Sequence, residues 1–246
     1  QFFTKDIVAQ YMVSLFDLPK NANIMDPCFG AGSFLKALAS SGFTNVTACE
    51  IDAALSNQIK DSYSQFRLLN TDFLQYDGSF DGIVMNPPYI RQEKIDELAE
   101  YGITKGKLRS NPLFSDLPST ANMYMYFIIK AIDLLKDGGQ LIVIFPSSWM
   151  NARTGHSFKK SLLEKCGLEK QVHIYGDVFD KEALVDVVIL KMIKRKLDLT
   201  TQELYLEAKE RELYSISSSK SQDLQIFEYP FSELATIRRG MTTGCN

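Results

Sequence analysis

The sequence predicts an α/β domain with a mostly parallel β-sheet and helices on both faces of that sheet. Two observations predict it. Short apolar runs bounded by turn residues alternate along the chain with segments of helical period. Strands that are joined through helices become parallel, and parallel strands are buried on both faces. We expect this pattern to continue to about residue 195.

The first half of the chain contains four expected strands, at residues 23–25, 46–49, 66–69 and 82–85. Each is a short, mainly apolar run that ends at turn or polar residues, as buried strands do. Helical period is found between them, at residues 33–40 and 53–63. The first of these helices directly follows a glycine-rich turn.

The second half begins with residues 123–136, whose apolar side chains fall on one helical face. The Asp-Gly-Gly sequence at 137–139 ends this helix in the manner of a C-cap. A continuous apolar strand follows at 141–145. A helix at 158–165 and strands at 172–175 and 184–193 bring the expected number of strands to seven.

Composition narrows the class of protein. With 246 residues, of which 45% are hydrophobic, the chain can bury a substantial core. No apolar run reaches the roughly 18 residues that span a bilayer, and the N-terminus lacks a secretory signal pattern. Four scattered cysteines and two histidines provide no closely spaced zinc ligands. These features predict a reduced, cytoplasmic protein with no metal site and no membrane partner.

The net charge of −3 gives no compositional sign of nucleic-acid binding, which rests mainly on Lys and Arg. The chain begins at Gln1 rather than at Met, so we expect a longer parent protein. After Lys196 the alternating pattern weakens. We therefore expect a catalytic domain at residues 1–195, followed at 196–246 by a linker and the start of a further domain.

A glycine-rich turn follows the first expected strand, with the sequence Asp26-Pro27-Cys28-Phe29-Gly30-Ala31-Gly32-Ser33. Glycine permits a tight turn and a close approach of the backbone to a ligand at the carboxyl edge of a sheet. The third glycine of the dinucleotide fingerprint is missing, which weakens an assignment to NAD. The turn alone does not identify the ligand.

Acidic residues follow the second and third expected strands. Glu50 ends the second strand, where an acid can accept both ribose hydroxyls of an adenosine-containing ligand. Asp72 follows the third strand and could accept from an adenine amine, while Phe73 or Ile51 flanks the ring. The order of these residues predicts an adenosine site at the sheet edge.

The fourth expected strand runs directly into Asn86-Pro87-Pro88-Tyr89. The side-chain oxygen of Asn86 and the main-chain oxygen of Pro87 are two acceptors, which the double proline holds in a stiff loop. Two acceptors that draw the protons of an NH2 group out of the ring plane make its nitrogen lone pair available to attack a methyl sulfonium. Tyr89 would stack on the same planar base. This motif predicts catalysis without a covalent nucleophile.

These motifs together resemble the N6-adenine DNA methyltransferases of restriction–modification systems, in the subgroup whose cofactor motifs precede the catalytic motif. The resemblance covers residues 1 to about 194. It implies a Rossmann-like methyltransferase fold, S-adenosylmethionine as cofactor and duplex DNA as partner. One departure is Cys28-Phe29, because small or different residues are more usual at these positions of the turn.

The resemblance also implies roles for individual residues. Thr4, in the opening sequence Gln1-Phe2-Phe3-Thr4, would contact the methionine part of the cofactor. The other cofactor residues would be Asp26, Gly30, Gly32, Glu50, Ile51, Asp72, Phe73 and Asn86. The catalytic residues would be Asn86, Pro87 and Tyr89. Phe179, after Val178, would stack on the opposite face of the extruded adenine.

DNA contacts are expected from residues 90–121, which have little apolar periodicity. This segment carries the basic residues Arg91, Lys94, Lys105, Lys107 and Arg109. A long insertion beside the catalytic tetrapeptide suits a DNA-contacting or gating loop. Acidic residues in the same segment dilute its charge, so a solvated surface excursion is an equal alternative.

Residues 231–246 resemble the opening of the family's target-recognition domain. Most of the DNA-reading surface would then lie outside this chain, and an endonuclease, fused or separate, is a further expected partner. Three alternatives stay open at this point. The first is an RNA or protein-glutamine methyltransferase with the same tetrapeptide. The second, a cofactor-binding but inactive DNA-binding subunit, is disfavoured by the intact Asn86 and Tyr89. The third, a cytosine methyltransferase with Cys28 as nucleophile, is disfavoured because Cys28 lies in the cofactor turn.

Overall fold

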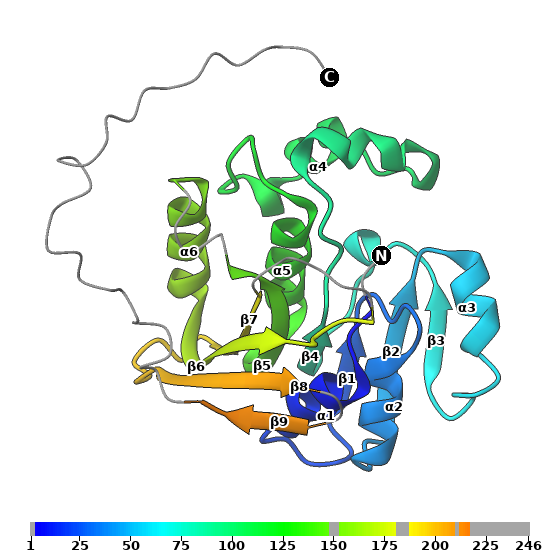
Figure 1. The fold of residues 1–246 in the computed structure, drawn as a ribbon. Helices are drawn as coiled ribbons and strands as arrows, with labels where there is room; N and C mark the ends of the chain where they lie inside the picture. The colour runs from blue at the N-terminus through cyan, green and yellow to red at the C-terminus, as the bar shows by residue number, and fades with distance from the viewer. Residues whose placement is uncertain (1–2, 148–152, 181–186, 210–211, 217–246) are drawn as a thin grey trace, which may run out of the picture. The chain divides into compact units, whose positions relative to one another are not determined.

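The computed structural model describes residues 3–147, 153–180, 187–209 and 212–216. Within these residues, nine strands form one sheet in the order β3-β2-β1-β4-β5-β7-β6-β8-β9 (Figure 1). The strands are β1 (Asn23–Asp26), β2 (Asn45–Glu50), β3 (Arg67–Asn70), β4 (Phe80–Met85), β5 (Leu135–Pro146), β6 (Cys166–Gly176), β7 (Val187–Lys194), β8 (Gln202–Lys209) and β9 (Glu212–Ser215). The helices are α1 (Asp6–Ser14), α2 (Ser33–Ser40), α3 (Ala53–Ile59), α4 (Lys105–Ser110), α5 (Met123–Leu134) and α6 (Arg153–Lys165), with 3-10 helices η1 (Phe73–Gln75), η2 (Gln92–Tyr101) and η3 (Pro112–Phe114).

The sheet is mostly parallel, as the sequence predicts. Strands β1 to β5 are all parallel to one another, whereas β7 runs antiparallel to both β5 and β6. Strand β1 lies between β2 and β4, so the chain winds outward from β1 in both directions. The carboxyl ends of β1 and β4 therefore meet at a topological switch point, which is where open α/β sheets bind their ligands.

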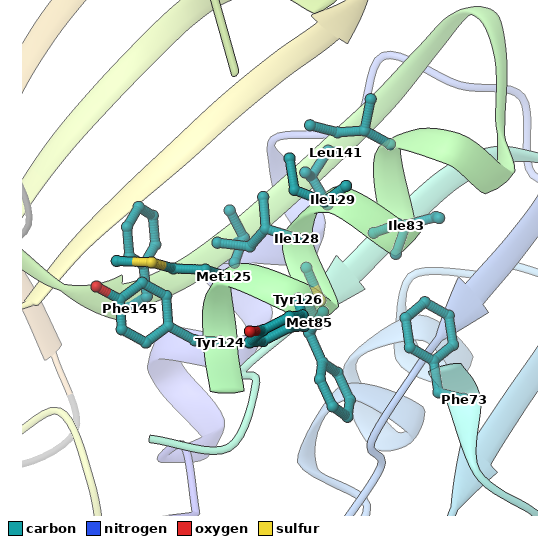
Figure 2. Packing of buried hydrophobic residues seen from close by; sticks show 14 of the residues in the cluster. Phe73, Ile83, Met85, Tyr124, Met125, Tyr126, Ile128, Ile129, Leu141 and Phe145 are labelled. Atoms are coloured by element: carbon teal, nitrogen blue, oxygen red, sulfur yellow. The ribbon is translucent and has the colours of Figure 1, made fainter. Parts of the chain in front are cut away.

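Successive residues of the central strands pack on opposite faces of the sheet. On one face, Ile83 and Leu141 belong to a core cluster with α5 (Figure 2). On the other face, Val84 and Ile142 belong to a second cluster that includes α1 and α2. This alternation follows from the two-residue period of a strand. Helices cover both faces, and the sequence prediction of the fold class is confirmed.

Two strands lie beyond the seven that the sequence predicts. Strand β8 pairs in parallel with β6, and β9 pairs antiparallel with β8. The compact unit consequently runs to Ser215, not to residue 195 as the sequence predicts. Within the stretch predicted as a linker, β8 and β9 are part of the sheet. The expected recognition segment at 231–246 lies outside the described residues.

The segment between β4 and α5 is the largest difference from the sequence prediction. The sequence predicts a long irregular insertion, but the segment folds into η2, α4 and η3. Ile95, Leu108 and Phe114 are buried and join the core cluster that contains α5. Only a few apolar side chains anchor the segment, at spacings that neither a strand nor a long helix would give. The hydrophobic periodicity of the sequence therefore does not predict these short helices.

Candidate functional site

A pocket of about 340 Å³ lies at the carboxyl edge of the sheet. Its wall comes from the turns that follow β1, β2, β3 and β4, together with residues of η2 and α5. Among the predicted site residues, nine line it: Thr4, Gly30, Glu50, Ile51, Asp72, Phe73, Asn86, Pro87 and Tyr89. The structure thus brings these nine residues together in one cavity, whereas Asp26 and Gly32 do not line it.

The glycine-rich turn is closed by a hydrogen bond to the acid that ends β2. Gly30 has a positive φ of 51°, and its amide donates to Oε2 of Glu50 at 2.9 Å. The amide of Asp52 donates to Oε1 of Glu50 at 3.0 Å. Each Glu50 oxygen keeps acceptor capacity beyond these bonds, because a carboxylate oxygen has two lone-pair sites. The turn and the acid therefore form one rigid wall.

Gly32 has a different role from the predicted one. Its φ is 85°, and a Cβ atom there would lie 3.1 Å from the side chain of Ile59 and 3.3 Å from that of Tyr63. Gly32 is not among the described residues that line the pocket. Gly32 allows the chain to turn into α2 where a larger residue would crowd the side chains of Ile59 and Tyr63. We therefore assign it to this turn rather than to a close approach of the backbone to a ligand.

Asp26 lies behind the pocket wall and is fully buried. Its Oδ1 accepts from the Cys28 amide at 3.3 Å, and no hydrogen-bond partner for Oδ2 is found among the described residues. Burial raises the pKa of this carboxyl to about 8, against the lowering effect of the Cys28 amide, and Glu50 adds to the rise. A buried carboxyl with one unpaired oxygen favours a positively charged ligand in front of it.

The ends of β3 and η1 form the other side of the adenosine site that the sequence predicts. Asp72 caps η1 by accepting from the Leu74 amide at 2.9 Å, and burial raises the pKa of its carboxyl. The rings of Phe73 and Phe127 lie 5.4 Å apart and both line the pocket. Ile51 lines it too, so either apolar residue named from the sequence can flank a planar ring.

The loop of residues 86–89 is held by two hydrogen bonds from distant parts of the chain. The Asn86 side chain donates from Nδ2 to Oγ1 of Thr4 at 3.1 Å. The thiol of Cys28 donates to the main-chain oxygen of Asn86 at 3.2 Å. Thr4 is only 4% exposed. Because Nδ2 of Asn86 is held by Thr4, the orientation of the whole side-chain amide is fixed. Oδ1 is then the atom of this amide that can accept a hydrogen bond.

Cys28 remains a thiol rather than a thiolate. Burial, followed by the nearby acids Asp26 and Glu50, raises the pKa of Cys28 well above its ordinary value. A nucleophilic cysteine needs the opposite shift. This environment argues against Cys28 as a covalent nucleophile and explains the unusual residue in the turn: it is a hydrogen-bond donor to the catalytic loop.

Tyr89 and Phe179 contact each other directly. Their ring centroids lie 6.1 Å apart with an interplanar angle of 76°, and the Tyr89 hydroxyl donates to the oxygen of Ile144 at 3.1 Å. Thr4 pairs with Phe179 through an isolated β-bridge. Phe179 is buried and is not among the described residues that line the pocket. The two rings are neighbours, but they meet edge to face and leave no slot for a base between them.

The basic residues expected to contact DNA do not line the pocket among the described residues. The side chain of Lys107 donates to the oxygen of Gly102 at 2.9 Å, and Arg109 donates to the oxygen of Ser119 at 2.6 Å. Arg91 is exposed just before η2. Lys107 and Arg109 thus hold their own segment together, and this function was not expected from the sequence.

Sequence reasoning missed the apolar side of the pocket. Leu98, Tyr101 and Ile103 line it from the end of η2, and Met123 and Phe127 from α5. Met123 and Phe127 sit four residues apart on a helix whose apolar pattern is visible in the sequence. No comparable signal marks the η2 residues.

The described part of the chain offers neither a membrane span nor a metal centre. No described helix is both long and apolar enough to cross a bilayer. Among the residues that the structure describes, no group of three or more His, Cys, Asp or Glu side chains is arranged to hold a metal ion.

The fold resembles that of solved methyltransferases. It is similar to a modification subunit of a putative type I restriction enzyme from Vibrio vulnificus, with a TM-score of 0.66 and 17% identity over 85% of this chain and 47% of that one. It is also similar to a putative class I S-adenosylmethionine-dependent methyltransferase from Listeria monocytogenes, with a TM-score of 0.65 and 16% identity over 85% of this chain and 66% of that one. At these identities the likeness concerns the fold.

Sequence comparison gives closer relatives. The Type II methyltransferase M.HincII of Haemophilus influenzae is 34% identical over 80% of this chain and 37% of its own length. M.BsuBI of Bacillus subtilis is 26% identical over 95% of this chain and 49% of its own length. The chain thus spans less than half the length of these relatives. Residues 33–179 match the model of the Eco57I restriction-modification methylase family, and the chain belongs to that family.

Proposed function

We propose that this chain is the catalytic part of a DNA methyltransferase that transfers a methyl group from S-adenosylmethionine to the N6 amine of adenine. The observation that carries the proposal is the oriented Asn86 amide. Thr4 and Cys28 hold it at the wall of a pocket that Gly30, Glu50 and Asp72 also line. Such a site presents acceptors to an amine next to a cavity suited to an adenosine derivative.

The residues of the pocket fit S-adenosylmethionine. The cofactor carries positive charge on its sulfonium and ammonium groups, and the buried Asp26 carboxyl with its unpaired oxygen lies behind Pro27 and Cys28. Glu50 has acceptor capacity for ribose hydroxyls. Asp72 can accept from the adenine amine between Ile51 and Phe73. Asp26, Glu50 and Asp72 thus suit the charged groups, the ribose and the adenine amine of one ligand. The apolar pair Ile51 and Phe73 suits its adenine ring.

The catalytic residues act by hydrogen bonding and positioning. When bound, S-adenosylmethionine supplies an electrophilic methyl group. Oδ1 of Asn86 and the carbonyl of Pro87 each accept a hydrogen bond from one N–H of the target amine and so localise the lone pair on its nitrogen. Preorganised acceptors of this kind need no rearrangement at the moment of reaction. The amine then loses a proton to solvent after methyl transfer.

Adenine must leave the DNA duplex to reach this site, because the amine inside a base pair is inaccessible. We propose that Tyr89 and Phe179 hold the extruded base. Their edge-to-face contact has to open for the base to enter, and a movement of Tyr89 would break its hydrogen bond to Ile144. Stacking on an aromatic ring contributes about 1–3 kcal/mol per base and can offset that loss.

DNA as the substrate rests on the family assignment, since the family takes its name from restriction–modification systems. We assign specific DNA recognition to parts of the protein beyond residue 215, because Lys107 and Arg109 of α4 bond within their own segment. An endonuclease, fused or separate, is a proposed partner because the family takes its name from restriction–modification systems.

Methyl transfer from radiolabelled cofactor tests the proposal, with the full-length protein and three substrates: unmethylated genomic DNA, total RNA and cell protein. Mass spectrometry of digested DNA should find N6-methyladenine. The Asn86→Ala variant should lose about 100-fold or more of the rate and keep its affinity for cofactor. A matched control is Asn57→Ala on the exposed surface of α3. Label in RNA, in protein glutamine or on cytosine would overturn the assignment, as would an unaltered rate for Asn86→Ala.

A further inference from the structure

The end of η2 forms a wall of the pocket that neither the glycine-rich turn nor the catalytic loop provides. Leu98, Tyr101 and Ile103 all line the cavity. The amide of Ile103 donates to the oxygen of Leu98 at 3.3 Å, which closes the turn on itself. Tyr101 stands out because it is 41% exposed, although its ring faces a pocket. An exposed aromatic ring at a pocket rim gains contact area when a ligand binds.

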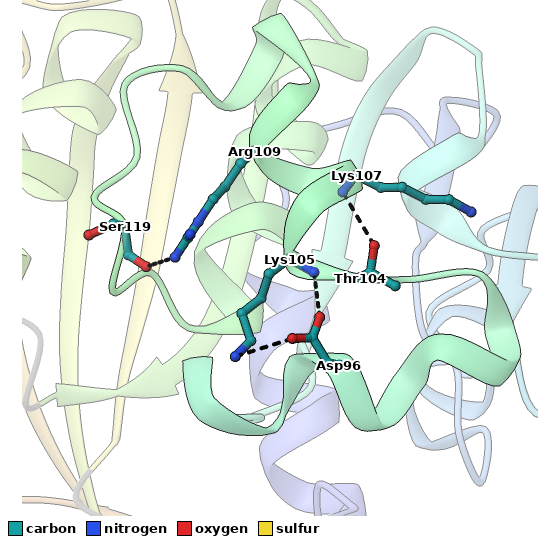
Figure 3. A network of polar contacts seen from close by, with 6 residues as sticks. All are labelled: Asp96, Thr104, Lys105, Lys107, Arg109 and Ser119. Atoms are coloured by element: carbon teal, nitrogen blue, oxygen red, sulfur yellow. Dashed lines mark hydrogen bonds and ion pairs between the residues drawn. The ribbon is translucent and has the colours of Figure 1, made fainter.

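A network of polar contacts fixes this turn in place (Figure 3). Asp96 accepts from the Lys105 amide at 2.8 Å and forms an ion pair with the Lys105 side chain at 3.3 Å. The side chain of Lys107 donates to the oxygen of Gly102, the residue after Tyr101, at 2.9 Å. Ile95, fully buried, anchors η2 below. The position of the Tyr101 backbone is therefore set before any ligand arrives.

The turn lies toward the cofactor end of the pocket. In Figures 1 and 3, η2 runs from above β4 toward the side of the sheet that carries β2, β3 and α3. Glu50 and Asp72 follow β2 and β3 on that side. Tyr89 instead hydrogen bonds to Ile144 of β5, in the opposite direction along the sheet. The end of η2 and the β5 contact of Tyr89 thus lie toward different sides of the sheet (Figure 1).

We propose that Tyr101 is a cofactor-binding residue whose ring packs against the adenosine part of S-adenosylmethionine, with Leu98 and Ile103 completing that wall. The inference rests on the proposed cofactor. It also gives two basic residues of this segment a function, because Lys105 and Lys107 brace the turn that carries Tyr101.

Isothermal titration calorimetry tests the inference with two ligands, S-adenosylmethionine and free adenosine. The variants are Tyr101→Ala and Tyr101→Phe, and the control is Tyr175→Ala, which removes a similarly exposed ring on β6 away from the pocket. Tyr101→Ala should weaken the binding of both ligands by the same factor, about fivefold or more. Tyr101→Phe should bind nearly as the unaltered protein does, because it keeps the ring.

The outcomes separate the inference from the proposed function. If the unaltered protein binds neither ligand, the cofactor assignment fails. If it binds both and Tyr101→Ala binds them equally well, Tyr101 is not a cofactor residue and the inference fails. The inference also fails if Tyr101→Ala lowers only the rate of methyl transfer, because Tyr101 would then contact the target base. Circular dichroism of each variant confirms that the fold is kept.

Discussion

Thr4 Oγ1 accepts a hydrogen bond from Nδ2 of Asn86 at 3.1 Å, between residues that are 82 positions apart. Thr4 itself is fixed by the pairing of its segment with residues 178–180, where the Lys5 amide donates to Val178 and the Asp180 amide to Phe3. The N-terminal segment therefore links Phe179, the expected base-stacking residue, to the side-chain amide of Asn86. Thr4 orients Asn86, whereas the sequence predicts only a contact with cofactor.

Thr4→Ala should lower the turnover number by about three- to tenfold, because a net hydrogen bond contributes about 0.5–1.5 kcal/mol and the amide loses its fixed orientation. Thr4→Ser keeps the hydroxyl and should restore most of the rate. Steady-state kinetics with the full-length protein measure both effects. Equal rates for Thr4→Ala and the unaltered protein would show that Asn86 does not need this bond.

Cys28→Ala should reduce the turnover number by about threefold, since a thiol is a weak donor, while Cys28→Ser should retain it.

The raised pKa of the Cys28 thiol also predicts how slowly it reacts with an alkylating reagent. Iodoacetamide should modify Cys28 slowly at pH 8, and faster only when the pH exceeds the ordinary thiol value. Peptide mapping by mass spectrometry measures this rate, with the denatured protein as reference. Rapid modification at pH 7 would contradict the assignment.

Asp26→Asn should stabilise the cofactor-free protein at high pH. The carboxyl has a pKa of about 8 in the folded protein against 3.8 for a free side chain, so folding favours its protonated form. Its contribution to stability is fully present below about pH 3.8 and is lost as the pH rises through 8. The neutral Asn has no such loss. The facing titratable groups are Glu50, Cys28 and Cys49.

Thermal unfolding at pH 5 and pH 8 measures this effect. The difference in Tm between Asp26→Asn and the unaltered protein should grow with pH, and saturating S-adenosylmethionine should diminish it by supplying positive charge. A Tm difference that is the same at both pH values would mean that Asp26 is already ionised in the free protein.

Tyr89→Ala should lower the turnover number about tenfold or more, because the extruded base loses an aromatic face. Tyr89→Phe keeps the ring and loses only the hydrogen bond to Ile144, which a movement of Tyr89 toward the base would break. It should therefore act nearly as fast as the unaltered protein. Cofactor affinity serves as the control and should be the same in both variants. A large loss in Tyr89→Phe would show that the hydroxyl, and not the ring, matters.

Local patterns predicted the sheet and most of the pocket. Apolar runs located all seven expected strands, and Asn86, Glu50 and Asp72 were recognisable because each follows a strand whose end is fixed by the parallel sheet. The same reasoning predicts no element where the apolar residues of the chain have no regular spacing. Strand β8 is only half-buried along much of its length, so it carries little of the apolar signal that marks β5.

Contacts between distant residues were beyond the reach of the sequence. Nothing local shows that Cys28 meets the main chain of Asn86, or that Tyr101 reaches the pocket of Glu50. These depend on how turns at one sheet edge converge, and on a few anchors such as Ile95. The fold class follows from periodicity, whereas the orientation of the catalytic amide follows from tertiary structure.

The wall that η2 gives to the pocket has a consequence for selective inhibition. Any enzyme that activates an amine with this tetrapeptide has to keep the acceptors of Asn86 and Pro87 and the glycine-rich turn. The chemistry places no such demand on Leu98 or Tyr101. A compound that occupies the adenosine site and extends toward these two side chains would exploit a part of the cavity that other methyltransferases are free to build differently.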